Sequence, residues 1–259
     1  MGGDNRRATS EPADFRDSWL LRTPIAHRGL HAAHDGRPEN SLAAFAHACA
    51  LGFPAELDVR LTRDGQVVVF HDRSLRRLTR AAGRVEERDA AEIRALRLLG
   101  TGERVPLLRE VLELVDGRVP LLVELKSSPL WPALEPAVIA ALDGYRGEVA
   151  IQSFKRRALR ELGRNETPHA VGHLWRWPGR PRSEVPAAFV GCPVDRAPSR
   201  AVRRRRDSGG IVLAWTVRSA DQAERVLRFV DNYIFEGFVP ELAAAHPVSA
   251  PESAARASR

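Results

Sequence analysis

Short apolar and β-branched runs alternate along the chain with segments whose apolar residues recur at helical spacing. Eight of the short runs are expected to form strands: 24–29, 55–60, 120–126, 149–154, 169–175, 188–195, 211–217 and 232–237. Six segments have a helical pattern or composition: 41–51, 89–115, 133–145, 155–163, 198–207 and 219–230. Eight strands that alternate with helices over about 220 residues predict an α/β fold, a (β/α)8 barrel. The proline- and arginine-rich stretch 175–188 need not be helical.

One apolar run, at residues 67–71, does not fit this alternation. It follows the second strand after a short stretch centred on Asp64-Gly65, which is too short for a parallel crossover of a dozen or so residues. Asp-Gly is instead a hairpin turn signal. We therefore expect a β-hairpin excursion after the second strand, outside the barrel, which folds His71 back beside Asp58.

Charged residues interrupt two of the predicted strands in the same way. Glu56 and Asp58 are two positions apart and share one face of their strand, and Glu124 and Lys126 repeat this spacing on another strand. Barrel active sites lie at the C-terminal ends of the strands, so we expect these side chains at the mouth of the barrel. Three carboxylates from two strands form a suitable oxygen site for Mg²⁺ or Ca²⁺. Each carboxylate alone could instead pair with an arginine, but their convergence is harder to explain in that way.

Two histidines and an arginine are expected beside this group. His27 and Arg28 end the first strand, and His71 ends the hairpin. Paired histidines next to a divalent cation suit general acid–base chemistry, and Arg28 and Lys126 suit a phosphate. This set predicts phosphoester hydrolysis. The remaining histidines are expected to be structural: His31, His34, His47, His169, His173 and His246.

Composition agrees with a globular protein that has a sizeable core. Hydrophobic residues make up 44% and charged residues 28% of the 259 residues, and the apolar runs are far shorter than the 18 or so residues of a membrane span. The N-terminus has no apolar region of the kind that a secretory signal needs, and two cysteines cannot form a disulfide framework. We expect a cytoplasmic protein with one domain over 19–246, between disordered tails at 1–18 and 247–259.

The net charge of +7 raises nucleic acid as a partner. The densest basic run, Arg203 to Arg206, lies in a helical pattern without the interleaved aromatic residues of a base-stacking surface. We interpret it as a solvated helix face and expect no nucleic acid as a partner. A basic, non-catalytic nucleic-acid-binding protein remains the alternative from another class, and it predicts tight binding that weakens steeply with salt. The basic surface also favours anionic small molecules by steering.

Several motifs follow one another in order over residues 22–242. They are Ile25-Ala26-His27-Arg28-Gly29, Pro38-Glu39-Asn40-Ser41, Glu56-Leu57-Asp58-Val59, Leu61-Thr62, Asp64-Gly65, His71-Asp72, Val123-Glu124-Leu125-Lys126, Gln152-Ser153-Phe154 and Trp215-Thr216-Val217. Together they closely resemble the glycerophosphodiester phosphodiesterase family. The resemblance implies a TIM barrel of the phospholipase C-like phosphodiesterase type, with a short capping insertion within 72–119.

The resemblance also implies roles for individual residues. It implies His27 and His71 as the catalytic acid–base pair, Glu56, Asp58 and Glu124 as ligands of a divalent cation, and Arg28 and Lys126 as phosphate contacts. Glu39 resembles the family's acidic residue near Arg28, where it supports the site or occasionally binds the metal. Trp215 matches an aromatic residue on the substrate side of the mouth, although a core tryptophan is an alternative interpretation.

The implied reaction is metal-dependent hydrolysis of a small-molecule glycerophosphodiester to sn-glycerol 3-phosphate and an alcohol. A lysophospholipase D, which cleaves the same bond next to a lipid-sized alcohol, is the nearest alternative. It needs an apolar surface at the mouth, which Trp175, Trp177 and the capping segment could supply. The head group, the choice of Mg²⁺ or Ca²⁺, the attacking nucleophile and the oligomeric state stay open.

Three positions depart from the family pattern. Arg218 replaces a common asparagine, Lys155-Arg156 stands where Asp-Pro is usual, and the last strand reads Tyr-Ile-Phe-Glu-Gly-Phe in place of Ile-Thr-Asp. We expect all three to lie outside the metal–histidine group and to affect the substrate more than the reaction.

Overall fold

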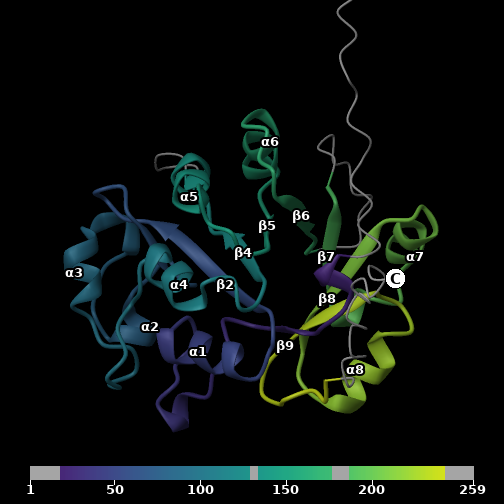
Figure 1. Ribbon diagram of the computed structural model, residues 1–259, viewed down its shortest axis with the longest axis horizontal. Coiled ribbons are helices and arrows are strands. Elements are labelled where there is room, and N and C mark those ends of the chain that lie inside the picture. Colours follow the sequence, from purple (N-terminus) through teal and green to yellow (C-terminus); the bar gives the residue numbers. More distant parts are fainter. Residues whose placement is uncertain (1–17, 129–133, 177–186, 243–259) are drawn as a thin grey trace, which may run out of the picture.

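The computed structural model describes residues 18–128, 134–176 and 187–242. Parallel strands form a closed barrel with helices around it (Figure 1). In chain order its strands are β1 (Ile25–Ala26), β2 (Ala55–Leu61), β4 (Leu121–Leu125), β5 (Val149–Ser153), β6 (Ala170–Leu174), β7 (Phe189–Pro193), β8 (Ile211–Val217) and β9 (Asn232–Phe235). The barrel closes where β1 pairs with β9, in the register Ile25 to Ile234, and with β2. The predicted (β/α)8 barrel is confirmed.

Helices cover the outer surface of the barrel. They are α1 (Leu42–Ala50), α4 (Leu108–Val115), α5 (Leu134–Leu142), α6 (Arg156–Arg164), α7 (Arg200–Asp207) and α8 (Ala220–Val226). The segment 89–115, which has a helical pattern, forms two separate helices, α3 (Ala90–Arg94) and α4. Leu99 and Gly100, between them, have positive φ angles of 49° and 74°, which a continuous helix does not accommodate. None of the described helices is long and apolar enough to cross a membrane.

The expected hairpin forms outside the barrel. Strand β3 (Val67–Val69) runs antiparallel to β2, with Val59 opposite Val69 and Leu61 opposite Val67. The N–H of Phe70 donates to the carbonyl of Asp58 at 2.8 Å, so the chain continues past Asp58 into His71. The hairpin therefore brings a residue from outside the barrel ring to the mouth.

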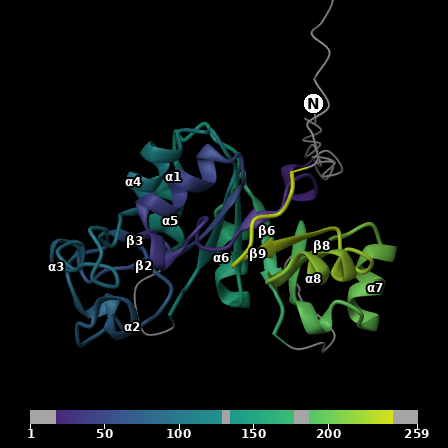
Figure 2. The same cartoon turned by 90° about the horizontal axis from the view of Figure 1, so that it is seen from below.

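The segment after the hairpin builds a small core of its own. It contains α2 (Arg76–Thr79) and α3, which lie on the opposite side of the molecule from α7 and α8 in both views (Figure 2). Ten buried apolar side chains form this core: Val68, Phe70, Leu75, Leu78, Val85, Ala90, Ile93, Leu98, Val105 and Leu107. This packing holds the segment 72–107 against the outer face of β3. Helix α4, at the end of the predicted 72–119 segment, packs instead into the main core, the larger apolar cluster between the barrel strands and the outer helices.

The interior of the barrel is apolar at its base and polar at its mouth. Leu122 and Ala150 point inward from β4 and β5, and two residues further along the same strands Glu124 and Gln152 do the same. The base is filled by Leu20, Ile25, Leu122, Ala150, Phe189, Ile211, Leu213 and Ile234. Strand alternation thus places the charged residues above a closed apolar floor.

The basic run lies on α7. Arg203 and Arg204 are exposed, as expected for a solvated helix face. Arg205 instead donates to the carbonyl of Ala187 at 2.7 Å, and Arg206 pairs with Asp231 at 3.0 Å. Half of the run therefore ties α7 to the barrel.

Gly29 lies where the chain passes close to α1 directly after β1. Its φ angle is 75°, and an added Cβ would lie 2.9 Å from Ala44 Cβ and 3.0 Å from the Ala44 carbonyl carbon. We expect Gly29→Ala to lower the free energy of unfolding by about 2–4 kcal/mol, through left-handed backbone strain and overpacking. Denaturant unfolding measures the change.

Gly36→Ala is the matched control, because Gly36 has a φ angle of 74° but no atom within 4 Å of an added Cβ. It is expected to lose only about 1 kcal/mol. Equal losses in the two variants would show that contact with Ala44 does not determine the requirement for glycine at position 29.

Candidate active site

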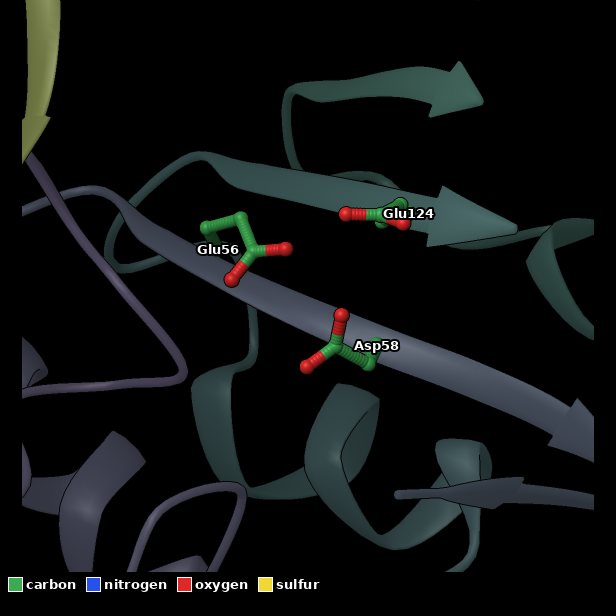
Figure 3. A group of neighbouring side chains, drawn as sticks. All are labelled: Glu56, Asp58 and Glu124. Atoms are coloured by element: carbon green, nitrogen blue, oxygen red, sulfur yellow. The ribbon is translucent and has the colours of Figure 1, made fainter. Parts of the chain in front are cut away.

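Three buried carboxylates meet at the mouth of the barrel (Figure 3). Glu56 and Asp58 come from β2, and Glu124 comes from β4, where it lies in register with Asp58. One oxygen from each of the three lies within 4.8 Å of the others. The acidic cluster follows directly from the strand register.

Burial and mutual repulsion change the pKa of each carboxyl. Burial, Asp58 and Glu124 raise the pKa of Glu56 well above its usual value, and burial raises the pKa of Glu124 to about 7 against the attraction of Lys126. Burial also opposes ionisation of Asp58, but the charges of Lys126, His71 and Arg28 outweigh it and lower the pKa of that carboxyl. The carboxyl groups therefore oppose one another's ionisation, and Glu56 and Glu124 keep their protons to a higher pH than ordinary carboxyl groups do.

A divalent cation fits this cluster. Lys126 Nζ lies 3.0 Å from Asp58 Oδ1 and also bonds Glu124, so those two carboxylates share one ammonium group. Glu56 Oε1 is buried and has no hydrogen-bond partner within the described ranges. Carboxylate oxygens are the ligands that hard divalent cations prefer, and a cation would satisfy this oxygen and relieve the repulsion. The acidic cluster could thus hold such an ion.

Arg28 is anchored to the cluster by its backbone and its side chain. At a φ angle of 54°, its N–H donates to Glu56 Oε2 at 3.0 Å. Its guanidinium lies 3.2 Å from Asp58 Oδ2 and donates to Glu39 Oε1 at 2.7 Å. Glu39 is outside the acidic cluster, and its contacts with Arg28 suit a supporting position.

Asn40 is a site residue that sequence reasoning missed. Its side-chain amide donates to Asp58 Oδ2 at 2.8 Å, and its side-chain oxygen accepts the N–H of Asp58 at 3.2 Å. Its own N–H donates to the carbonyl of Arg28 at 2.9 Å, and its φ angle is 58°. Asparagine tolerates this left-handed conformation better than most residues do. The asparagine in the motif Pro-Glu-Asn-Ser was therefore the feature of the sequence that could have indicated this position.

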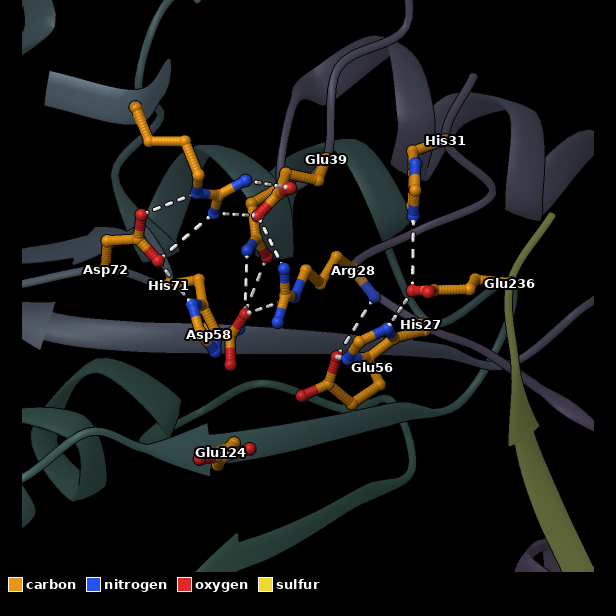
Figure 4. A network of polar contacts seen from close by, with 12 residues as sticks. His27, Arg28, His31, Glu39, Glu56, Asp58, His71, Asp72, Glu124 and Glu236 are labelled. Carbon is orange, nitrogen blue, oxygen red and sulfur yellow. Dashed lines mark hydrogen bonds and ion pairs between the residues drawn. The ribbon is translucent and has the colours of Figure 1, made fainter. Parts of the chain in front are cut away.

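His27 is hydrogen-bonded to the carboxylate of Glu236, the residue that directly follows β9. Its Nδ1 lies 2.6 Å from Glu236 Oε2, while its Nε2 faces the acidic cluster, 4.0 Å from Glu56 Oε2 (Figure 4). Hydrogen bonds from His27 and His31 lower the pKa of Glu236 well below its usual range. Glu236 is therefore an ionised acceptor, so Nδ1 of His27 carries the proton and Nε2 is left to react.

His71 has the same arrangement from the opposite side. Its Nδ1 lies 2.6 Å from Asp72 Oδ1, and Asp72 in turn accepts from Arg77. Arg77 also bonds Glu39, so the insertion is tied to the loop after β1. Despite burial, hydrogen bonds from Arg77 and His71 lower the pKa of Asp72 to about 2. An ionised carboxylate thus holds each of the two histidine rings.

Burial lowers the pKa of both histidines. For His27 the hydrogen bond to Glu236 opposes this effect, and for His71 the charge of Asp58 and the bond to Asp72 oppose it. The net shift of the pKa is downward for both rings, so each holds a proton less readily than a free imidazole and is suited to accept one.

The expectation that all three departures lie outside the metal–histidine group was wrong for the last strand. Glu236, in the Tyr-Ile-Phe-Glu-Gly-Phe segment, contacts His27 directly. Arg218, another departure, lies 2.6 Å from Glu236 Oε1 through its NH2 group. The sequence did contain an indication of this role for Glu236, because a carboxylate directly after the eighth barrel strand lies at the end of the barrel that forms the mouth.

Part of this site lines a cavity of about 510 Å³ at the mouth. Its lining comprises His27, Arg28, Glu56, His71, Glu124, Lys126, Gln152, Phe154, Leu174, Arg176, Trp215, Thr216, Arg218 and Ile234. Trp215, from β8, is half-buried and meets Phe154 edge to face at 5.4 Å. In the described part of the chain, no residue of 72–119 belongs to the lining.

One of the two tryptophans proposed for an apolar surface at the mouth packs elsewhere. Trp175 is 7% exposed and packs into the main core, and Trp177 is outside the described residues. Of the histidines expected to be structural, His31 lies 3.9 Å from Glu236, and His34 is exposed and pairs with Asp35. His246 is outside the described residues.

Comparisons with known proteins agree with this site. The family model of the glycerophosphoryl diester phosphodiesterase family matches residues 27–232. A glycerophosphodiester phosphodiesterase of Caldanaerobacter subterraneus is 33% identical over 235 residues, which cover 79% of this chain and 89% of that protein. A probable glycerophosphodiester phosphodiesterase 2 of Mycobacterium tuberculosis is 34% identical over 230 residues, with coverages of 80% and 83%.

A solved structure shares both the fold and part of the sequence. An Oleispira antarctica phosphodiesterase in complex with the product sn-glycerol-3-phosphate superposes with a TM-score of 0.74 and 26% identity, over 83% of this chain and 93% of that one. From the family match and these relatives, the chain belongs to the glycerophosphoryl diester phosphodiesterase family.

Proposed function

We propose that this enzyme hydrolyses glycerophosphodiesters to sn-glycerol 3-phosphate and an alcohol, with Mg²⁺ or Ca²⁺ at Glu56, Asp58 and Glu124. The observation that carries the proposal is a cluster of three buried carboxylates beside a cavity that two carboxylate-bonded histidines line. Family membership and the sn-glycerol-3-phosphate bound by the Oleispira antarctica enzyme support this substrate class.

Charge neutralisation at the phosphate is divided between the ion and two side chains. When bound, the divalent cation supplies Lewis-acid stabilisation of the charge that develops on the phosphoryl oxygens. Arg28 and Lys126 line the same cavity beside the acidic cluster, where their donors are positioned for the remaining phosphate oxygens. Both side chains are held by carboxylates, which orients them before substrate binds.

The two histidines move the protons. Nε2 of one ring accepts the proton of the attacking hydroxyl as its oxygen bonds to phosphorus. Nε2 of the other ring donates a proton to the alcohol oxygen as the second phosphorus–oxygen bond breaks. Glu236 and Asp72 stabilise the imidazolium form of each ring in turn. Attack by water gives glycerol 3-phosphate directly. Attack by the substrate's own glycerol hydroxyl gives a cyclic phosphate, which water then opens to glycerol 3-phosphate with the same two histidines exchanging their acid and base roles.

The test is release of glycerol 3-phosphate from a panel of glycerophosphodiesters, measured with EDTA and after addition of Mg²⁺ or Ca²⁺. We expect release that EDTA abolishes and one of the two cations restores. A lysophospholipid in the same panel tests the lysophospholipase D alternative, for which Trp175 supplies no exposed apolar surface. Release that continues unchanged in EDTA after removal of tightly bound metal would overturn the proposed role of the cation.

Glu236 is expected to orient His27. Replacing it by glutamine removes the charge of the side chain but keeps an oxygen that can accept the hydrogen bond. Glu236→Gln should lower kcat by roughly 10- to 100-fold, because the ring loses the ionised acceptor that fixes its tautomer. Glu236 raises the pKa of His27, so in the variant the limb of the pH–rate profile that His27 contributes should move to lower pH.

Glu236→Asp keeps the charge and is expected to retain more activity than Glu236→Gln. Glu241→Gln is a control for the loss of one exposed carboxylate nearby in the sequence. Steady-state kinetics between about pH 5 and 9 measure both effects. An unshifted pH profile in Glu236→Gln would show that Glu236 does not act through the histidine.

A further inference from the structure

More than half of the residues that line the cavity lie outside the acidic cluster and the histidine pair. The acidic cluster and the histidines come from β1, β2, β4 and the hairpin. Phe154 and Arg176 follow β5 and β6, while Trp215 lies on β8 and Arg218 directly follows it. The strand order places this second half across the mouth from the acidic cluster, because β6 and β8 face β1 and β4 in the ring.

Arg176 is held over an aromatic ring. Its guanidinium carbon lies 5.0 Å from the centroid of Phe154, and Phe154 in turn packs edge to face against Trp215. Arg176 is exposed, and no carboxylate lies within ion-pair distance of it among the residues that the structure places. Stacking therefore positions this cation without neutralising it.

Arg218 borders the same part of the cavity. Its NH2 group lies 2.6 Å from Glu236 Oε1, and its NH1 group donates to the carbonyl of Thr216 at 3.4 Å. Its side chain is 64% exposed, so donors remain open to the cavity. Glu236 offsets much of its charge, which makes Arg176 the larger source of positive potential on this wall.

These cations are additional to those that meet the phosphodiester. Arg28 and Lys126 lie beside the acidic cluster and face the phosphate, so Arg176 and Arg218 face a group attached to it. A quaternary ammonium head group would need free aromatic faces, yet Arg176 covers one face of Phe154 and repels a cation.

We propose that this half of the cavity selects glycerophosphodiesters whose alcohol carries its own negative group, such as a phosphate. The inference rests on the proposed hydrolysis of glycerophosphodiesters and names the substrate class within it. It also gives a role to the exposed donors of Arg218, a departure from the family pattern, in addition to its pairing with Glu236.

Three substrates that differ in the charge of the alcohol test this inference. They are glycerophosphoglycerol phosphate, glycerophosphoglycerol and glycerophosphocholine, with an anionic, neutral and cationic alcohol. We expect kcat/KM to fall in that order. Arg176→Gln should lower the ratio of kcat/KM for the anionic substrate over the cationic one by roughly three- to tenfold, mainly through KM.

Arg164→Gln is the matched control for loss of one positive charge. Arg164 is the last residue of α6, at the opposite end of the barrel from the mouth, and its side chain is 75% exposed. The substrate ratio is expected to stay unchanged in this variant, which separates local binding from general steering. Arg218→Gln gives a second measurement of the substrate ratio. Because Arg218 also pairs with Glu236, the ratio and not the absolute rate is compared in this variant. Thermal unfolding verifies the fold of each variant.

The outcomes are distinguishable. Hydrolysis of all three substrates with a ratio that Arg176→Gln leaves unchanged would overturn this inference and leave the proposed function standing. An equal loss on all three substrates would mean that the arginine contacts the shared glycerol phosphate part, and would also overturn it. Hydrolysis of none of the three, with the divalent cation bound, would overturn the proposed function and this inference together.

Discussion

Replacing His71 by alanine is expected to lower kcat/KM by roughly 10²- to 10⁴-fold with the fold intact, because the cavity loses one of its two proton-transfer groups. The side chain is 32% exposed, and its ring is held by Asp72 through a single hydrogen bond, so its removal opens little of the core. Initial rates of glycerol 3-phosphate release, together with thermal unfolding, measure the effect.

His34→Ala is the control for this experiment, because His34 is 83% exposed and lies outside the cavity lining. It is expected to keep full activity. His27→Ala should behave like His71→Ala, and the double variant should lose little more than either single variant, since both act in one reaction coordinate. Activity within threefold of the wild type in His71→Ala would remove the acid–base assignment.

Replacing Glu56 by glutamine is expected to lower activity and to raise the stability of the metal-free protein. The loss of a cation ligand should cost several kcal/mol of transition-state stabilisation, or roughly 10²- to 10³-fold in rate. The isosteric amide keeps an oxygen for the N–H of Arg28 but removes a charge that burial, Asp58 and Glu124 make unfavourable. The two effects have opposite signs, which a simple packing defect would not produce.

The stability gain should depend on pH. The pKa of Glu56 is raised in the folded protein, so as pH rises above the ordinary carboxyl range the unfolded chain releases a proton that the folded chain retains. This difference lowers wild-type stability with rising pH. The advantage of Glu56→Gln in EDTA should therefore be small near pH 5 and larger at pH 8.

Thermal unfolding in EDTA, and then with Mg²⁺ or Ca²⁺, measures the stability of the wild type and of Glu56→Gln without and with the cation. Added cation should stabilise the wild type more than the variant, because binding to the folded state alone raises the unfolding temperature. Glu113→Gln, an exposed position on α4, controls for the change in net charge. A variant that is less stable than the wild type in EDTA at pH 8 would contradict the repulsion inferred for the acidic cluster.

The barrel and most of the site follow from local sequence patterns. Alternation within strands places Glu56, Asp58 and Glu124 on inward faces, and a turn signal at Asp64-Gly65 brings His71 to them. Each of these relations joins residues of one strand, one hairpin or two neighbouring parallel strands. Such relations are visible in a sequence because the strand period of two and the hairpin turn are local properties.

What the sequence did not reveal depends on contacts that only the closed barrel creates. Glu236 lies 209 positions after His27 and meets it because β9 pairs with β1. Asn40 binds Asp58 from a loop whose left-handed conformation no periodicity encodes. Arg77, one of many arginines, links Asp72 to Glu39 through the packing of the insertion, which has its own small core.

The pairing of the first barrel strand with the last has a consequence for protein synthesis. The residue that holds His27 follows the final strand, so a nascent chain emerging from the ribosome has neither a closed ring nor an oriented His27 until β9 is complete. Catalytic competence should therefore arise in one step, once β9 and Glu236 have been synthesised, instead of growing with chain length. A fragment released early by proteolysis or premature termination before Glu236 would be inactive, however well its first strands had formed.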